Sequence, residues 1–199
     1  MKNILSILII ILALQSSFAQ KLIKDIDFDG KKDSVYMDDK ESRIVCRLST
    51  QNFKKIKSQP IEILNEMSGI IDAKNGFVFF NDWMRAGYKN HFRYNKKTKK
   101  IQLIGMSRYE FGNAVNDGSG ESSVNLLTSD YIGNWNYFDD LANNEEGELV
   151  KLPTIKTKMK FQEINLEDFS EDTYFGFSER CSKLYYQQKE KIQKMKLKQ

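Results

Sequence analysis

The sequence predicts a mainly β protein, in which antiparallel hairpins form a sandwich or a propeller-like sheet assembly and a helix follows at the C-terminal end. Two observations predict the sheets: short runs rich in Val, Ile, Phe and Tyr recur along the chain, and Asn, Asp, Gly and Lys separate them. This alternation is typical of antiparallel strands joined by tight turns. A third observation predicts the helix, because no Gly or Pro follows Gly176 and helix-forming residues dominate from there on.

Three hairpins are indicated by pairs of apolar runs around a polar turn. The first pairs residues 34–37 with 43–49, and another pairs residues 89–94 with 101–109 around a lysine-rich turn. Between them lies GIIDAKNGFVFFND, whose Asn75-Gly76 pair suits a turn that requires positive φ. More strands are expected at residues 122–127, 131–138, 149–152 and 156–162.

The C-terminal helix is expected to begin near Glu179, with Ser178 as its N-cap. Lysines are frequent between Lys189 and Lys198, which suits a solvated helix end; docking to an acidic partner or to envelope lipid is the alternative. The acidic stretch at residues 139–148, DDLANNEEGE, is predicted to be a surface loop.

Residues 1–19 have the pattern of a secretory signal peptide. Lys2 precedes an apolar run at residues 4–14, and Ser17 and Ala19 place small residues where a signal peptidase reads the chain. The run is too short for a membrane span, although an uncleaved anchor is the alternative. No later stretch is apolar enough to cross a bilayer. No cysteine lies near the cleavage site, so we do not expect a lipid anchor. We therefore expect a single domain over residues 20–199 that is periplasmic or secreted.

The charge balance gives no sign of a nucleic-acid partner. The chain carries 31 Lys and Arg against 27 Asp and Glu, a formal net charge of +4, and the two signs are interleaved except near the end. Nucleic-acid-binding domains concentrate a larger positive charge on one surface. We therefore expect a partner of another class.

The two cysteines, Cys46 and Cys181, leave two alternatives open. In an oxidising compartment an even number of cysteines permits a disulfide, which would here tie the two parts of the chain together. The other alternative is a pair of buried thiols, which the apolar strand pattern around Cys46 favours.

The segment DIDFDGKKD places carboxylates at the spacing of a calcium-binding loop. Asp25, Asp27, Asp29 and Asp33 are candidate ligands through their side chains, and Lys31 through its carbonyl, while Gly30 allows the sharp turn. Calcium takes six to eight oxygen ligands, and this spacing lets one short loop surround a single Ca²⁺ ion. The glutamate that closes an EF-hand is missing, because Tyr36 stands in its place. The loop resembles the strand–loop–strand calcium loops of FG-GAP repeats, which implies a structural metal; a charged turn without an ion is the alternative.

The sequence offers no convincing catalytic group, and we expect no enzymatic activity. His91 is the only histidine and lies in a strand pattern, so zinc sites and Ser–His–Asp triads are hard to assemble. Ser119 lies in NDGSGESS, which lacks the G-x-S-x-G spacing of a nucleophile elbow. A carboxylate pair such as Glu110 with Glu121 would be the remaining option, as in a glycosidase.

Residues 92–135 carry a hairpin, the turn Phe111-Gly112-Asn113, the loop NDGSG and the segment SVNLLTSDY. This stretch resembles exported bacterial immunity proteins that are paired with cell-wall-degrading toxins of type IV secretion systems, and more broadly the periplasmic lysozyme inhibitors. In those inhibitors a Ser-Gly-x-x-Tyr loop enters the hydrolase cleft. Here Ser119-Gly120-Glu121-Ser122-Ser123 has Ser where Tyr is expected.

The resemblance implies a protein partner, a cell-wall hydrolase, and an inhibitory loop at Asp117, Gly118, Ser119, Gly120 and Glu121. We expect these residues to form the tip of a protruding loop, because Gly118 and Gly120 allow a tight turn and close approach of the backbone. The alternative is an envelope protein that binds carbohydrate or another surface without inhibiting an enzyme. A toxin gene beside this one would distinguish the two functions.

Overall fold

The computed structural model describes residues 21–196 and confirms a mainly β protein with one C-terminal helix. The predicted signal peptide lies outside the described residues. The smaller of two antiparallel sheets has the order β1-β2-β3-β4. Its strands are β1 (Leu22–Lys24), β2 (Asp33–Asp38), β3 (Arg43–Arg47) and β4 (Lys55–Lys57). A 3-10 helix, η1 (Ser49–Gln51), connects β3 to β4.

The larger sheet has the order β11-β10-β9-β8-β7-β6-β5, with β12 also paired to β10. Its strands are β5 (Ser68–Ala73), β6 (Gly76–Asp82), β7 (Ala86–Asn95), β8 (Lys100–Glu110), β9 (Gly120–Asn125), β10 (Asp130–Asp139), β11 (Glu148–Lys151) and β12 (Ile155–Lys158). β12 pairs with the first half of β10 and β11 with the second half, so both shield one edge of the sheet.

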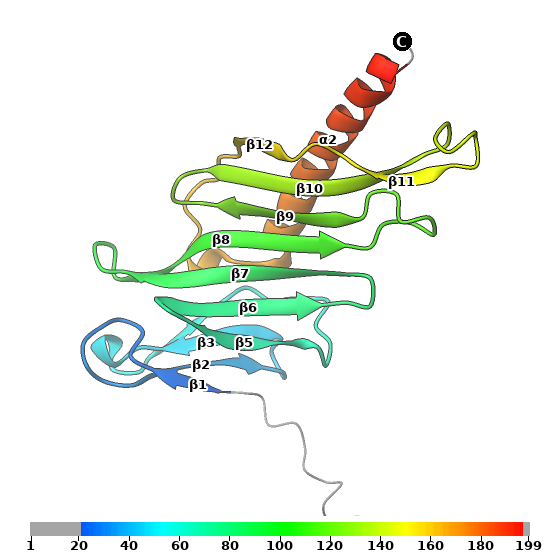
Figure 1. The fold of residues 1–199 in the computed structure, drawn as a ribbon. Helices are drawn as coiled ribbons and strands as arrows, with labels where there is room; N and C mark the ends of the chain where they lie inside the picture. The colour runs from blue at the N-terminus through cyan, green and yellow to red at the C-terminus, as the bar shows by residue number, and fades with distance from the viewer. Residues whose placement is uncertain (1–20, 197–199) are drawn as a thin grey trace, which may run out of the picture.

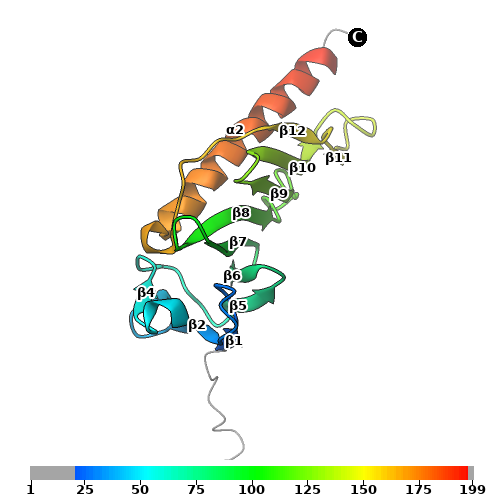
Figure 2. The same cartoon turned by 90° about the vertical axis from the view of Figure 1, so that its left-hand side faces the viewer.

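One face of the large sheet is covered and the other is open. Helix α2 (Glu171–Lys196) lies across the covered face, and the small sheet lies on the same side at the β5 end (Figures 1 and 2). The short helix η2 (Leu166–Asp168) precedes α2 and contacts both β4 and β8. One hydrophobic cluster joins the two sheets and α2, which is consistent with the sandwich-like alternative.

The period of two in the strands explains why only one face is buried. In β10, Tyr131, Trp135 and Tyr137 are buried, while the alternate residues Ile132, Asn134 and Asn136 are more exposed. Aromatic rings fill the space under α2: Tyr88 stacks on Tyr174 of the helix with ring centroids 4.1 Å apart. Burial of such large apolar surfaces supplies most of the driving force for this arrangement.

The helix begins at Glu171 rather than near Glu179. Gly176 had suggested that the helix starts later, but a side chain added there would meet nothing within 4 Å, and the helix continues through it. The first turns are held by packing, since Tyr174 and Phe177 are buried against the sheet. This packing outweighs the roughly 1 kcal/mol by which glycine disfavours a helix.

The other predicted elements are confirmed with small shifts in their ends. The hairpin at Asn75-Gly76 joins β5 to β6, and Gly76 has a φ of +151°. A side chain at Gly76 would lie 1.9 Å from the carbonyl oxygen of Phe92, so the close approach of β7 requires glycine. Residues 140–147 form the predicted surface loop between β10 and β11. Strands β1 and β4, of three residues each, were not predicted.

Both cysteines are buried free thiols, and the disulfide alternative is not realised in the structure. Cys46 lies on β3 of the small sheet, whereas Cys181 lies on α2 and accepts a hydrogen bond from Ser122 Oγ at 3.3 Å. Burial raises the pKa of both thiols, so both stay protonated and unreactive at neutral pH. Among residues 21–196, no helix combines the length and apolarity that a bilayer crossing requires.

Candidate functional site

The aspartate loop connects β1 to β2 and brings three of its carboxylates together. One oxygen from each of Asp25, Asp27 and Asp29 lies within 4.8 Å of the other two. The backbone turns sharply here, because Phe28 and Gly30 have φ values of 65° and 88°. As a result the alternate aspartates converge, although alternation along a straight strand would only place them on one side.

Asp33 has a different role from the predicted one. Its side chain is almost fully buried, and its Oδ2 accepts hydrogen bonds from the N–H groups of Ile26 at 2.7 Å and Asp27 at 3.2 Å. Its Oδ1 accepts from the N–H of Ser49 at 2.7 Å. The hydrogen bonds of Asp33 therefore hold the loop against η1. Lys31 lies in the same turn, where its N–H donates to Asp29 Oδ1 at 2.8 Å.

Two residues that the sequence did not single out, Ser49 and Thr50, orient the carboxylates from η1. Ser49 Oγ donates to Asp29 Oδ2 at 2.8 Å, and Thr50 Oγ1 donates to Asp27 Oδ2. The Lys31 N–H and then the Ser49 hydroxyl hold the pKa of Asp29 below its usual value. No spacing rule links Ser49 to a loop twenty residues earlier, so a single sequence carries no signal for these contacts.

The predicted inhibitory loop is pinned at its base, not exposed as a tip. Asp117 accepts hydrogen bonds from Lys189 Nζ at 2.8 Å, from Tyr185 OH at 3.0 Å and from the N–H of Phe138 at 2.7 Å. Burial acts to raise the pKa of Asp117, but these donors outweigh it and the net shift is downward. The prediction that Asp117 lies at a tip was wrong because its carboxylate is bound by α2.

The remaining residues of this segment are also built into the sheet. The N–H of Gly118 donates to the carbonyl of Asn136 at 3.0 Å, and Ser119 Oγ accepts from Asn136 Nδ2 at 3.1 Å. Gly120 and Glu121 belong to β9, where Glu121 pairs with Tyr109. Of the predicted segment, only Glu121 is exposed.

The exposed part of the β8–β9 connection is the preceding stretch, residues 111–116. It is held rigidly: Arg85 Nη2 donates to the carbonyl oxygens of Phe111, Gly112 and Asn113 at 3.2 to 3.4 Å. Asn113 Oδ1 accepts from the N–H groups of Val115 and Asp117, both at 3.0 Å. Phe111 and Val115 nevertheless stay about half exposed, at 49% and 46%.

Three connections lie at the same end of the large sheet, and we call this surface the loop end (Figure 1). They are residues 83–85 between β6 and β7, residues 111–119 between β8 and β9, and residues 140–147 between β10 and β11. Met84 is 88% exposed and Leu141 68% exposed, and both lie on this surface. A hollow of about 230 Å³ lies between residues 110–118 and α2, where Tyr185 and Tyr186 line it.

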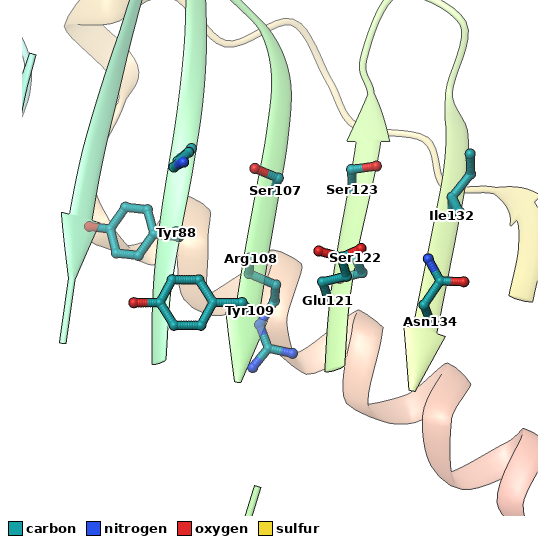
Figure 3. Close-up of a pocket in the computed structure, with 10 residues that line it drawn as sticks. Tyr88, Ser107, Arg108, Tyr109, Glu121, Ser122, Ser123, Ile132 and Asn134 are labelled. Carbon is teal, nitrogen blue, oxygen red and sulfur yellow. The ribbon is translucent and has the colours of Figure 1, made fainter. Parts of the chain in front are cut away.

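The open face of the large sheet forms a second hollow, of about 260 Å³. Figure 3 shows Tyr109, Glu121 and Asn134 on three neighbouring strands, with α2 behind the sheet. Ser107 and Ser123 form the next cross-strand pair on the same face. His91 also lines a hollow on this face, and burial, followed by the charge of Arg93, lowers its pKa.

The carboxylate pair considered for a glycosidase, Glu110 with Glu121, is separated by the sheet. Glu110 forms an ion pair with the buried Arg108, on the covered side. Glu121 pairs with Tyr109, which is one residue away from Glu110 and therefore faces the opposite side. Two carboxylates on opposite faces cannot flank one glycosidic bond.

Comparison with protein-family models, with curated proteins and with solved structures finds no match to this chain. The basis for inferring a function is therefore the geometry of the aspartate loop, the loop end and the open face, together with the sequence patterns described above.

Proposed function

We propose that the protein is a non-catalytic binding protein of the inhibitor or immunity type, which binds a peptidoglycan hydrolase through its loop end. The observation that carries this proposal is a set of exposed apolar side chains on the loop end: Met84, Phe111, Val115 and Leu141. Exposed apolar groups that gather on one surface are typical of protein-interaction sites.

Rigidity is what makes this surface suited to tight binding. The three hydrogen bonds from Arg85 to backbone carbonyl oxygens fix residues 111–113. The guanidinium carbon of Arg85 also lies 5.9 Å from the ring centre of Phe111. At the base of the loop, Asp117 is held by Tyr185 and Lys189 of α2. A loop that is already ordered loses little conformational entropy on binding, so more of the contact energy appears as affinity.

The class of partner comes from the resemblance of residues 92–135 to immunity proteins and lysozyme inhibitors. The signal-peptide pattern in residues 1–19 supports the same choice, because a periplasmic or secreted protein meets the enzymes that cut the cell wall. The site differs from the expected one: residues 111–116 contact the hydrolase, and residues 117–121 support them from below.

The test is inhibition of cell-wall lysis by a lysozyme-like hydrolase encoded beside this gene, followed as the clearing of a cell-wall suspension. We expect the unmodified protein to inhibit lysis, and Met84→Glu and Phe111→Glu each to weaken inhibition by about tenfold or more, as expected for an interface hot spot. Leu127→Glu is the matched control, because Leu127 is 50% exposed but lies in the turn at the opposite end of β9. Lysis that proceeds unchanged with the unmodified protein would overturn the proposal.

A second candidate function is binding of an envelope carbohydrate on the open face. The hollow there is lined by Tyr109, by the carboxylate of Glu121 and by the amide of Asn134, which together offer a ring face and hydrogen-bonding groups. Soluble peptidoglycan fragments, titrated by calorimetry, distinguish the two functions. Binding that Tyr109→Ala abolishes and Met84→Glu leaves intact would favour the carbohydrate function.

A further inference from the structure

We propose that Asp25, Asp27 and Asp29 bind one calcium ion, and that this ion ties the small sheet to the large sheet. Three carboxylates within 4.8 Å are the first observation. The second is independent of it: Asp27 is only 4% exposed, and its Oδ1 is buried without a hydrogen-bond partner among the described residues. This oxygen belongs to the carboxylate group that forms the cluster with Asp25 and Asp29.

A buried carboxylate oxygen without a partner is unfavourable, and in a native protein it calls for an explanation. An ion pair does not provide one, because none of the salt bridges within residues 21–196 involves Asp25, Asp27 or Asp29. The other oxygen of Asp27 is already occupied by Thr50. A cation in the loop would give Oδ1 its partner and would also relieve the repulsion among the three carboxylates.

The chemistry of the ligands selects a hard cation. The cluster offers carboxylate oxygens alone, since His91 lies on β7 and both cysteines are buried elsewhere in the fold. Oxygen ligands suit calcium and magnesium rather than zinc. Calcium accepts six to eight ligands in an irregular shell, whereas magnesium demands a near-ideal octahedron at shorter distances. A strongly curved loop with one buried and two more exposed carboxylates, open to water, fits the more tolerant ion.

The position of the loop gives the ion a structural role. Asp27 accepts a hydrogen bond from Thr50 and Asp29 accepts one from Ser49, so a cation bound by these aspartates would also fix the loop against η1. Gln51 of η1 donates to the carbonyl oxygen of Lys99 at 3.0 Å, and Lys96 lies 5.1 Å from the ring centre of Phe28. Lys96 and Lys99 belong to the β7–β8 turn of the large sheet, at the end opposite the loop end (Figure 1).

The experiment is a calorimetric titration of calcium chloride into the full chain after treatment with a chelator. We expect one calcium ion per chain. We also expect Asp27→Asn and Asp29→Asn each to weaken binding by at least about tenfold, because even the loss of a group that only hydrogen-bonds to a metal ligand typically weakens binding by about 10- to 100-fold. Asp39→Asn is the matched control, an exposed aspartate in another turn of the same sheet, and it should bind calcium like the unmodified protein.

Circular dichroism checks that each variant is folded, and Asp29→Asn keeps the test decisive should Asp27→Asn fail to fold, because Asp29 is exposed. No heat with the unmodified protein, or equal affinity in Asp29→Asn, would overturn the site. Tighter binding of magnesium or zinc chloride would overturn the assignment to calcium. The proposal is independent of the loop end, so hydrolase inhibition can fail while calcium binding holds.

Discussion

At the scale of single residues, neighbouring aspartates in one short loop have opposite roles. Both carboxylate oxygens of Asp33 accept hydrogen bonds from backbone N–H groups, whereas one oxygen of Asp27 is buried and has no hydrogen-bond partner among the described residues. The spacing in the sequence predicts the same ligand role for both residues. Their difference comes from burial and from η1, which reaches the loop only in the folded chain.

Asp33 is therefore expected to contribute to stability by the same amount with and without calcium. In Asp33→Asn the amide nitrogen, itself a donor, would face backbone N–H donors, and the charge-assisted hydrogen bonds would be lost. The free energy of unfolding should therefore fall by about 2–4 kcal/mol. Urea unfolding, with and without calcium, measures this effect. Asp130→Asn is the control, because its exposed pair with Lys158 contributes little. A loss that is much larger in calcium than in chelator would instead make Asp33 a ligand, because the variant would then also lack the stabilisation by the bound ion.

At the scale of elements, α2 does more than cover the sheet. Lys189 binds Asp117 at the base of the β8–β9 connection, and Lys196 pairs with Asp139 where β10 ends. Asp117 lies near the end of the β8–β9 connection and Asp139 at the start of the β10–β11 loop, and both loops belong to the loop end. The lysine-rich end of the helix, which the sequence presented as a solvated face, thus positions the proposed binding surface.

The Asp117 contact should depend on pH in a defined direction. Its donors lower the pKa of Asp117 in the folded state, so its contribution to stability is complete above the unfolded value, about 3.9, and is lost as the pH falls through the folded value. Asp117→Asn removes that contribution. Urea unfolding between pH 7 and pH 3 should therefore show a gap between the two proteins that narrows below about pH 4. A gap that stays constant would contradict the role of the charge.

Periodicity and turn chemistry predict most elements, because large apolar residues alternate along most of the length of the long strands. Strands β1 and β4 were missed since three residues are too few to display a period. The helix start was misplaced because buried Tyr174 and Phe177 outweigh Gly176. The loop tip was misplaced because Asp117 meets Lys189 from the far end of the chain. Such long-range pairs leave no trace in a single sequence.

At the scale of the whole molecule, the two proposed sites lie at opposite ends of the large sheet. The aspartate loop and the β7–β8 turn lie at one end, and residues 83–85, 111–119 and 140–147 lie at the other (Figure 1). Between them runs one continuous hydrophobic core. The two proposals thus place a stabilising ion at the aspartate loop and recognition at the loop end, so a change at one end should leave the other largely unaffected.

The central claim, that the loop end binds a cell-wall hydrolase, is tested most directly by amide hydrogen exchange of the protein alone and in complex with that enzyme. We predict that the enzyme slows exchange in residues 83–85, 111–119 and 140–147, and that the turns at residues 96–99 and 126–129 exchange at the same rate in both samples. Protection of the open face around Tyr109 and Ser123, with the loop end unchanged, would contradict the claim.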